Sequence, residues 1–67
     1  MLIQELVGMN IRKYRILKKY SQEDLAMKCN LHRTYISSIE LGKKSPSLNV
    51  LNNIAKQLDI KIKDLFL

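Results

Sequence analysis

The chain has 67 residues, of which 46% are hydrophobic and 27% are charged, with only two Gly and one Pro. A chain this short forms one small domain and buries only about 60% of the surface that its unfolded form exposes, which excludes a large catalytic cleft or a separate cofactor domain. Twelve Lys and Arg against six Asp and Glu give a net charge of +6, and this basic balance favours a polyanionic partner.

Other classes of protein are excluded by what the sequence lacks. No apolar run approaches the roughly 18 residues of a transmembrane helix, and the first residues do not form a secretory signal, so we expect no membrane partner. The one cysteine, Cys29, has no partner for an internal disulfide and is expected to be a small buried thiol in a cytoplasmic protein. No phosphate loop, zinc set or activated nucleophile is recognisable, so we expect no enzyme activity, cofactor or metal.

Apolar residues recur at helical spacing along nearly the whole chain, and this pattern predicts an all-α bundle of five helices. The second helix begins after Ser21, a good N-cap, with Asp24 in its first turn close to a capping box. It ends at Asn30, which tolerates a left-handed conformation. The first helix runs from about residue 3 to residue 19 and is expected to pack through Ile3, Val7, Ile11, Tyr14 and Leu17.

The connection between the second and third helices is the most informative segment. Only residues 29–32 join the second helix to a third helix at about 33–40, and so short a turn suits a steep crossing better than an antiparallel pair. Ala26 provides the small side chain needed where the two helices cross. The unit from about 21 to 41 therefore reads as a helix-turn-helix, whose second helix enters the DNA major groove.

The rest of the chain is expected to support this unit. Ile36 and Ile39 are expected to pack the third helix against the core. Gly42 is expected to end this helix by adopting a left-handed backbone conformation. Ser47, or Ser45 with the following proline as the first helical residue, caps a fourth helix. That helix is expected to pack through Leu48, Leu51, Ile54, Ala55 and Leu58.

Four stretches of the sequence also carry a family resemblance. They are Ser21-Gln22-Glu23-Asp24-Leu25-Ala26, Arg33-Thr34-Tyr35-Ile36-Ser37, Ile39-Glu40-x-Gly42-Lys43 and Pro46-Ser47-Leu48. With them, the chain resembles the Cro/C1-type (XRE) family of helix-turn-helix DNA-binding domains from about residue 7 to residue 66. The resemblance implies one lambda-repressor-like DNA-binding domain over residues 1–67. The stretch 30–37 is similar to the controller proteins of restriction–modification systems, which are small single-domain dimers.

The resemblance implies a role for individual positions of the second and third helices. Gln22 matches a residue that bonds a DNA phosphate, and Tyr35 is expected to pack partly while its hydroxyl reaches a phosphate. Arg33 has two donors suited to guanine O6 and N7, with a phosphate contact as the alternative, whereas Ser37 and Ser38 are too short to discriminate strongly by themselves. The positions that match groove-facing, base-reading residues are Arg33, Thr34, Ser37 and Ser38.

The basic loop after the third helix is a second candidate for DNA contact. Lys43 and Lys44 stand beside Ser45 and Ser47 at a helix N-terminus, an arrangement that suits a backbone phosphate. The alternative is a mobile basic loop.

Four further positions are singled out by the comparison with the family pattern. Arg15 and Glu40 match an internal ion pair that fixes the third helix against the first. His32 stands where the family has a Ser or Thr cap, so we expect it to cap poorly and to be either a plain exposed histidine or a DNA contact. Lys19 replaces a glycine at the end of the first helix, which predicts a strained or differently shaped turn.

Residues 62–67 are expected to form a last short helix with more apolar surface than it can bury alone. This surface predicts a two-fold dimer that places two third helices about 34 Å apart on a palindromic operator. The predicted protein is thus a transcriptional regulator, which would also contact RNA polymerase if it activates. The alternatives are a phage-type or chromosomal repressor and, from another class, an antitoxin or other protein-binding module. The predicted dimer residues are Ile60, Ile62, Leu65, Phe66 and Leu67.

Overall fold

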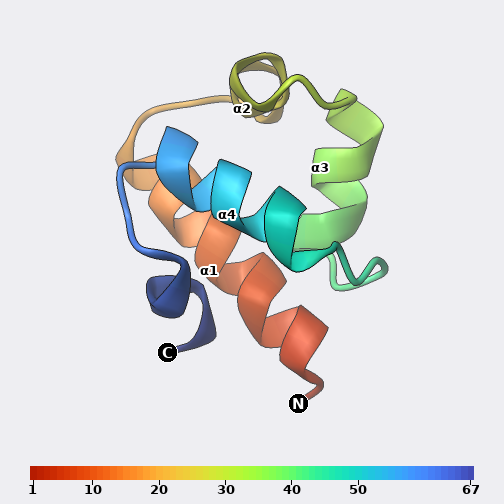
Figure 1. Cartoon of the computed structure of the whole chain (residues 1–67). Coiled ribbons are helices and arrows are strands. Elements are labelled where there is room, and N and C mark those ends of the chain that lie inside the picture. Colours follow the sequence, from red (N-terminus) through yellow and green to blue (C-terminus); the bar gives the residue numbers. More distant parts are fainter.

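The computed structural model describes residues 1–67 and contains helices and no strands, which confirms the all-α prediction (Figure 1). The predicted count of five α-helices is corrected in one respect, because the last element is a 3-10 helix. In chain order the elements are α1 (Ile3–Leu17), α2 (Gln22–Cys29), α3 (Arg33–Glu40), α4 (Leu48–Gln57) and the 3-10 helix η1 (Ile62–Phe66).

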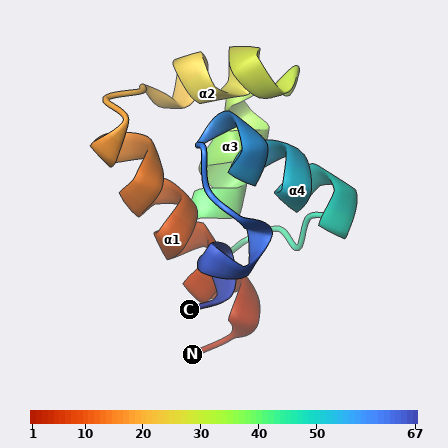
Figure 2. The ribbon, with the colours of Figure 1, turned by 60° about the vertical axis from the view of Figure 1, so that its left-hand side comes forward.

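The helices are arranged so that α3 lies between α1 and α2. Helix α1 packs against α3 and η1, α2 packs against α3 and α4, and α4 packs against η1. Figures 1 and 2 both show α2 crossing the beginning of α3 steeply, as expected from the short turn between them. The two chain termini lie together at the end of the molecule opposite α2. None of the helices combines the length and the apolar character that a membrane span requires.

The predicted N-caps are present. The hydroxyl of Ser21 accepts a hydrogen bond from the backbone N–H of Asp24 (2.9 Å), and the Asp24 carboxylate accepts one from the backbone N–H of Ser21 (2.8 Å). This is a complete capping box. At α4 the cap is Ser47, whose hydroxyl accepts from the backbone N–H of Val50 at 3.1 Å. Of the two serines considered for this cap, the later one therefore starts the helix.

Four residues with a left-handed backbone close the four α-helices: Lys19 (φ 62°), Asn30 (φ 56°), Gly42 (φ 75°) and Asp59 (φ 58°). Asn30 and Gly42 were expected in this role. At Lys19 the turn is strained as predicted, because a lysine occupies a conformation that only glycine adopts without a steric penalty. Helix α1 ends at Leu17, two residues before the predicted end at about residue 19.

One continuous core fills the space between the helices. Cys29 belongs to it, and burial raises the pKa of its thiol to about 11, as expected of an inert buried cysteine. Ala26 is also buried. The core residues are Val7, Ile11, Leu25, Ala26, Cys29, Ile36, Ile39, Leu51, Ile54, Ala55, Leu58 and Leu65.

Four predicted positions are wrong. Ile3, Leu17 and Leu48 were expected in the core but are 57%, 71% and 70% exposed. Each is the first or last residue of its helix, where the apolar stripe extends past the neighbouring helices. Leu65 was expected at the dimer contact, but its exposure is 0% and it packs in the core. Periodicity identifies the apolar face of a helix and does not show how far a partner covers it.

Candidate nucleic-acid interface

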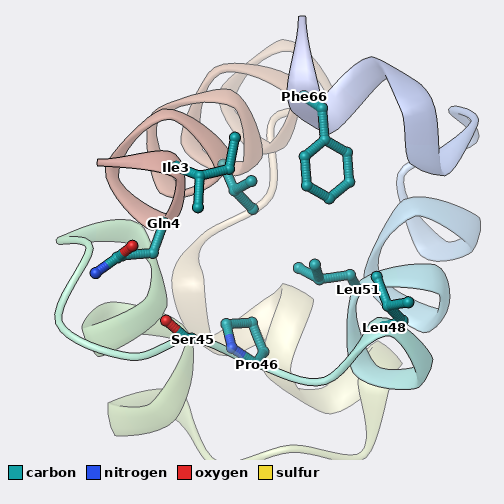
Figure 3. A pocket seen from close by; sticks show the side chains of 8 residues that line it. Ile3, Gln4, Ser45, Pro46, Leu48, Leu51 and Phe66 are labelled. Carbon is teal, nitrogen blue, oxygen red and sulfur yellow. The ribbon is translucent and has the colours of Figure 1, made fainter. Parts of the chain in front are cut away.

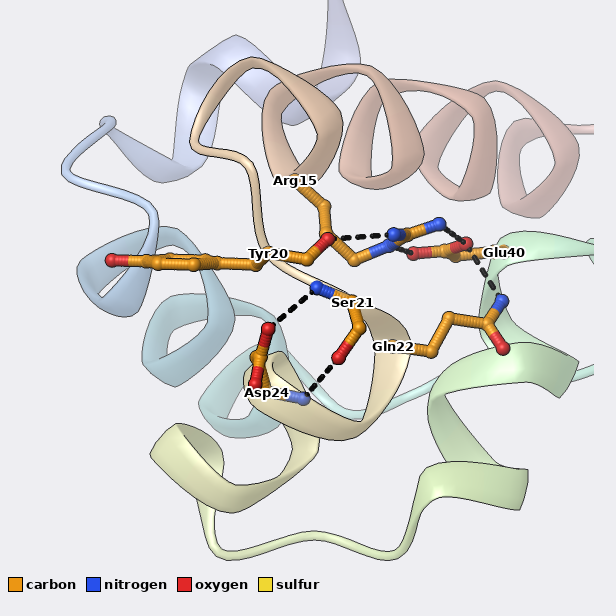
Figure 4. A network of polar contacts seen from close by, with 6 residues as sticks. All are labelled: Arg15, Tyr20, Ser21, Gln22, Asp24 and Glu40. Atoms are coloured by element: carbon orange, nitrogen blue, oxygen red, sulfur yellow. Dashed lines mark hydrogen bonds and ion pairs between the residues drawn. The ribbon is translucent and has the colours of Figure 1, made fainter.

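The end of α3 is fixed by a buried ion pair with α1, as predicted. The side chains of Arg15 and Glu40 are only 11% and 2% exposed. The guanidinium donates from Nε to Oε2 (2.6 Å) and from Nη2 to Oε1 (3.0 Å), so the contact is bidentate (Figure 4). The third nitrogen, Nη1, donates to the carbonyl oxygen of Tyr20 at 2.8 Å. Bidentate geometry holds the orientation of α3 as well as its position.

Gln22 joins this network, which the sequence did not predict. Its Nε2 donates to Oε1 of Glu40 at 3.0 Å, and its side chain is half-buried between α2 and α3 (Figure 4). The carboxamide carries a second amide hydrogen and an oxygen that this hydrogen bond does not use. Gln22 therefore links the start of α2 to the end of α3, with groups left to meet a ligand.

Gly8 provides a second attachment of α3 that the sequence analysis missed. A Cβ atom at this position would lie 2.3 Å from the carbonyl oxygen of Ile39 and 2.7 Å from that of Glu40. The backbones of α1 and α3 are thus in direct contact. The sequence signal for this contact was the glycine itself. Inside a helix, glycine is less favourable than alanine by roughly 0.5–1 kcal/mol.

The beginning of α3 is, in contrast, open to solvent. The side chains of Arg33 and Thr34 are exposed, and those of Ser37 and Ser38 are half-buried. Arg33 and Ser37 are four residues apart, as are Thr34 and Ser38, and Thr34 and Ser37 are three apart, so these side chains share one helical face. Tyr35 is half-buried against the core, as its expected partial packing requires. The structure thus places four predicted base-reading residues on one accessible surface.

The expectation that His32 caps α3 poorly is wrong. Its ring nitrogen Nδ1 accepts a hydrogen bond from the backbone N–H of Thr34 (3.3 Å) and lies 2.9 Å from the Thr34 hydroxyl oxygen. This ring nitrogen takes the place of the usual Ser or Thr hydroxyl oxygen at the cap. The imidazole itself is exposed.

The basic loop between α3 and α4 is exposed at all four predicted phosphate-binding positions. Lys43 and Lys44 make no ion pair. Ser45 is exposed, and Ser47 accepts the capping hydrogen bond with its oxygen, which leaves its hydroxyl hydrogen available. The loop therefore presents two ammonium groups and hydroxyl donors at the first turn of α4.

The terminal segment lies on the opposite side of α4 from α2. Asn10 is buried and donates to the carbonyl oxygens of Leu65 (2.9 Å) and Leu67 (3.1 Å), which holds this segment on α1. Of the predicted dimer residues, Phe66 and Leu67 are exposed, whereas Ile60 and Ile62 are half-buried against the core.

Phe66 borders a hollow of about 180 Å³ (Figure 3). Its lining comes from the start of α1, the basic loop, α4 and η1, and most of it is apolar. The lining residues are Ile3, Gln4, Val7, Ser45, Pro46, Leu48, Leu51 and Phe66.

Comparison with known proteins agrees with this geometry. The helix-turn-helix family model HTH_3 matches residues 11–65. The chain belongs to this helix-turn-helix family of the Cro/C1 (XRE) type. As a helix-turn-helix protein it falls in a class of DNA-binding transcription regulators. It is 47% identical over 64 residues to the control protein C.BamHI of Bacillus amyloliquefaciens, a match that covers 94% of this chain and 79% of that protein.

Two solved structures of restriction–modification controller proteins are similar to this chain. The controller protein C.AhdI from Aeromonas hydrophila superposes with a TM-score of 0.90 at 35% identity, covering 94% of this chain and 96% of that chain. The controller protein C.Esp1396I, as a tetramer in complex with its natural 35-base-pair operator, superposes with a TM-score of 0.84 at 36% identity. That match covers 97% of this chain and 96% of that chain.

Proposed function

We propose that residues 1–67 form one DNA-binding domain that regulates transcription by binding a palindromic operator as a homodimer, with α3 in the major groove. The observation that carries the proposal is the arrangement of α3. Its buried end is fixed to α1 and α2 by Arg15, Gln22 and Glu40, while its first turn presents exposed polar side chains to solvent. A helix held in this way is a rigid element with an open surface for base edges.

Contacts to the bases are assigned to the exposed face of α3. Arg33 has the reach and the paired donors for guanine, and Thr34 offers a hydroxyl and a methyl group. Ser37 and Ser38 allow the helix to lie deep in the groove. His32 is placed at the edge of this surface, where its Nε2 is available for a base or a phosphate.

Contacts to the phosphates are assigned around the two ends of the helix-turn-helix unit. Lys43 and Lys44 carry the charge, and nearby hydroxyl groups orient a phosphate at the N-terminus of α4. Gln22 would use the amide hydrogen that its contact with Glu40 leaves free. The assigned phosphate-binding residues are Gln22, Tyr35, Lys43, Lys44, Ser45 and Ser47.

The dimer contact is assigned to Phe66 and Leu67, with smaller contributions from the half-buried Ile60 and Ile62. Both end residues are exposed and apolar, and Phe66 lines the apolar hollow beside α4. A two-fold contact there presents two copies of α3 to half-sites about one helical turn apart.

The similarity to C.BamHI and C.Esp1396I supports a controller of a restriction–modification system as the biological role. Such a protein would act in the cytoplasm on its own promoter and on that of the restriction gene, and would contact RNA polymerase when it activates. A phage-type or chromosomal repressor would use the same interface on a different operator.

The test is a gel-shift titration of the purified protein against the DNA upstream of its own gene, at salt concentrations from 50 to 200 mM. We expect binding that resists bulk competitor DNA and weakens steeply with salt, because each neutralised phosphate releases counterions. A protein that copurifies as a stable complex with another protein, and that binds this DNA no better than bulk DNA, would overturn the proposal in favour of an antitoxin.

A further inference from the structure

The cap of α3 fixes where the proton of the His32 ring lies. A backbone N–H can only donate, and that of Thr34 points at Nδ1 of His32 at 3.3 Å. Nδ1 therefore has no hydrogen and uses its lone pair. A neutral imidazole carries one hydrogen, so this hydrogen is on Nε2.

The same nitrogen determines the direction of the Thr34 hydroxyl. Oγ1 of Thr34 lies 2.9 Å from Nδ1, which is hydrogen-bond distance. With no hydrogen on Nδ1, the hydroxyl is the donor in this contact and shares the single Nδ1 lone pair with the Thr34 backbone N–H. The oxygen then has only lone pairs left for a ligand, and the Thr34 side chain is exposed at the first turn of α3.

We propose that His32 is a specificity-determining residue, which turns Thr34 into a pure hydrogen-bond acceptor and so makes it select adenine or cytosine at one position of each half-site. In the major groove only adenine N6 and cytosine N4 carry donor hydrogens, whereas guanine and thymine present acceptors. The inference rests on the proposed function, since it assumes that Thr34 meets a base. A serine or threonine cap at position 32 could accept the backbone N–H and still leave the polarity of Thr34 unfixed.

The test compares base preferences in a selection from randomised duplexes, using the intact protein and four variants. The wild type should select adenine or cytosine at the Thr34 position. His32→Ala frees the hydroxyl to donate and should shift the preference toward guanine or thymine by about fivefold or more, the lower limit for one good base contact. His32→Asn keeps an acceptor oxygen in reach of both groups and should retain the wild-type preference.

Thr34→Val supplies the matched control, because it removes the hydroxyl and keeps the shape. It should lose discrimination at this position alone, and adding His32→Ala to it should change the preference no further. A change of His32→Ala that weakens all sequences equally would overturn the inference and leave His32 as a structural cap. Unchanged preference in Thr34→Val would overturn it as well, while operator binding by the wild type would still support the proposed function.

A measurement on the wild-type protein avoids any dependence on the folding of variants. The nitrogen chemical shifts of the His32 ring at pH 8 report which nitrogen carries the hydrogen. We expect an unprotonated Nδ1 and a protonated Nε2 in the intact chain. A protonated Nδ1 would overturn the inference. Failure of the wild type to prefer any duplex over bulk DNA would instead reject the proposed function, so the two failures are distinguishable.

Discussion

The two ends of α3 are held in different ways. At its last residues, Glu40 is bound by Arg15 and Gln22, which lie 25 and 18 positions away in the sequence and come from two other helices. At its first residues, the one hydrogen bond between two side chains joins His32 and Thr34, which are two positions apart. The fold thus sets the position and orientation of the helix at one end and leaves the other end exposed to solvent. The following predictions test this division.

The largest effect is expected at the fixed end. Glu40→Ala leaves the guanidinium of Arg15 buried without its carboxylate, and loss of one partner of a buried pair is unfavourable by about 3–5 kcal/mol. Chemical denaturation should show this loss in the free energy of unfolding. Glu23→Ala, which removes an exposed carboxylate from α2, is the matched control and should change it by less than about 1 kcal/mol. Equal losses in the two variants would contradict the comparison.

Gly8→Ala tests the backbone contact between α1 and α3. In an ordinary helix this substitution is stabilising by roughly 0.5–1 kcal/mol. Here the added methyl meets the carbonyl oxygens of Ile39 and Glu40, so we expect a loss of about 1–3 kcal/mol. The sign of the change in thermal stability therefore decides whether the contact is as close as the structure shows.

Arg33→Ala tests the free end, where function and stability should separate. The free energy of unfolding should change by no more than about 0.5 kcal/mol, because the side chain is exposed and makes no hydrogen bond or ion pair within the protein. Operator binding should weaken by about 1–3 kcal/mol, with relaxed preference at one base position.

Lys43→Ala is the control for Arg33→Ala, since it removes a charge assigned to a phosphate. It should weaken binding to all sequences equally and lower the salt slope by about one. The same sequence-independent loss for both variants would show that Arg33 does not read a base.

The smallest effect is expected at the local cap of α2. Hydrogen bonds from the backbone N–H and the hydroxyl of Ser21 hold the pKa of Asp24 below its usual value. Its stabilising effect is therefore present above the pKa of the unfolded carboxyl group, near 4, and is lost as the pH falls through the lower folded value. Asp24→Asn should lose less stability than the wild type in this acid range, as measured by thermal unfolding between pH 2 and pH 5.

Sequence reasoning succeeded where the structure depends on neighbours in the chain. Ser21 and Ser47 as caps and Asn30 and Gly42 as helix ends follow from residue type and position alone. It failed where distant segments decide the outcome. Leu48 and Leu65 have the same residue type, yet one is exposed and the other fully buried, because only the second is covered by another element.

The candidate site shows the same limit. The ion pair of Arg15 and Glu40 came from a family pattern, and nothing in the local sequence brings together residues so far apart. The contact of Gln22 with Glu40 was missed for that reason. His32 was misjudged because its capping depends on the ring conformation, which residue preferences do not describe.

The close contact at Gly8 has a consequence for how such proteins diversify. The residues that set the pose of α3 are not the residues assigned to contact bases. Substitutions at positions 33, 34, 37 and 38 can therefore accumulate without remodelling the scaffold. With the proposed base contacts, new operator sequences would become reachable one side chain at a time, so that a duplicated copy could acquire separate target genes while both copies continue to fold.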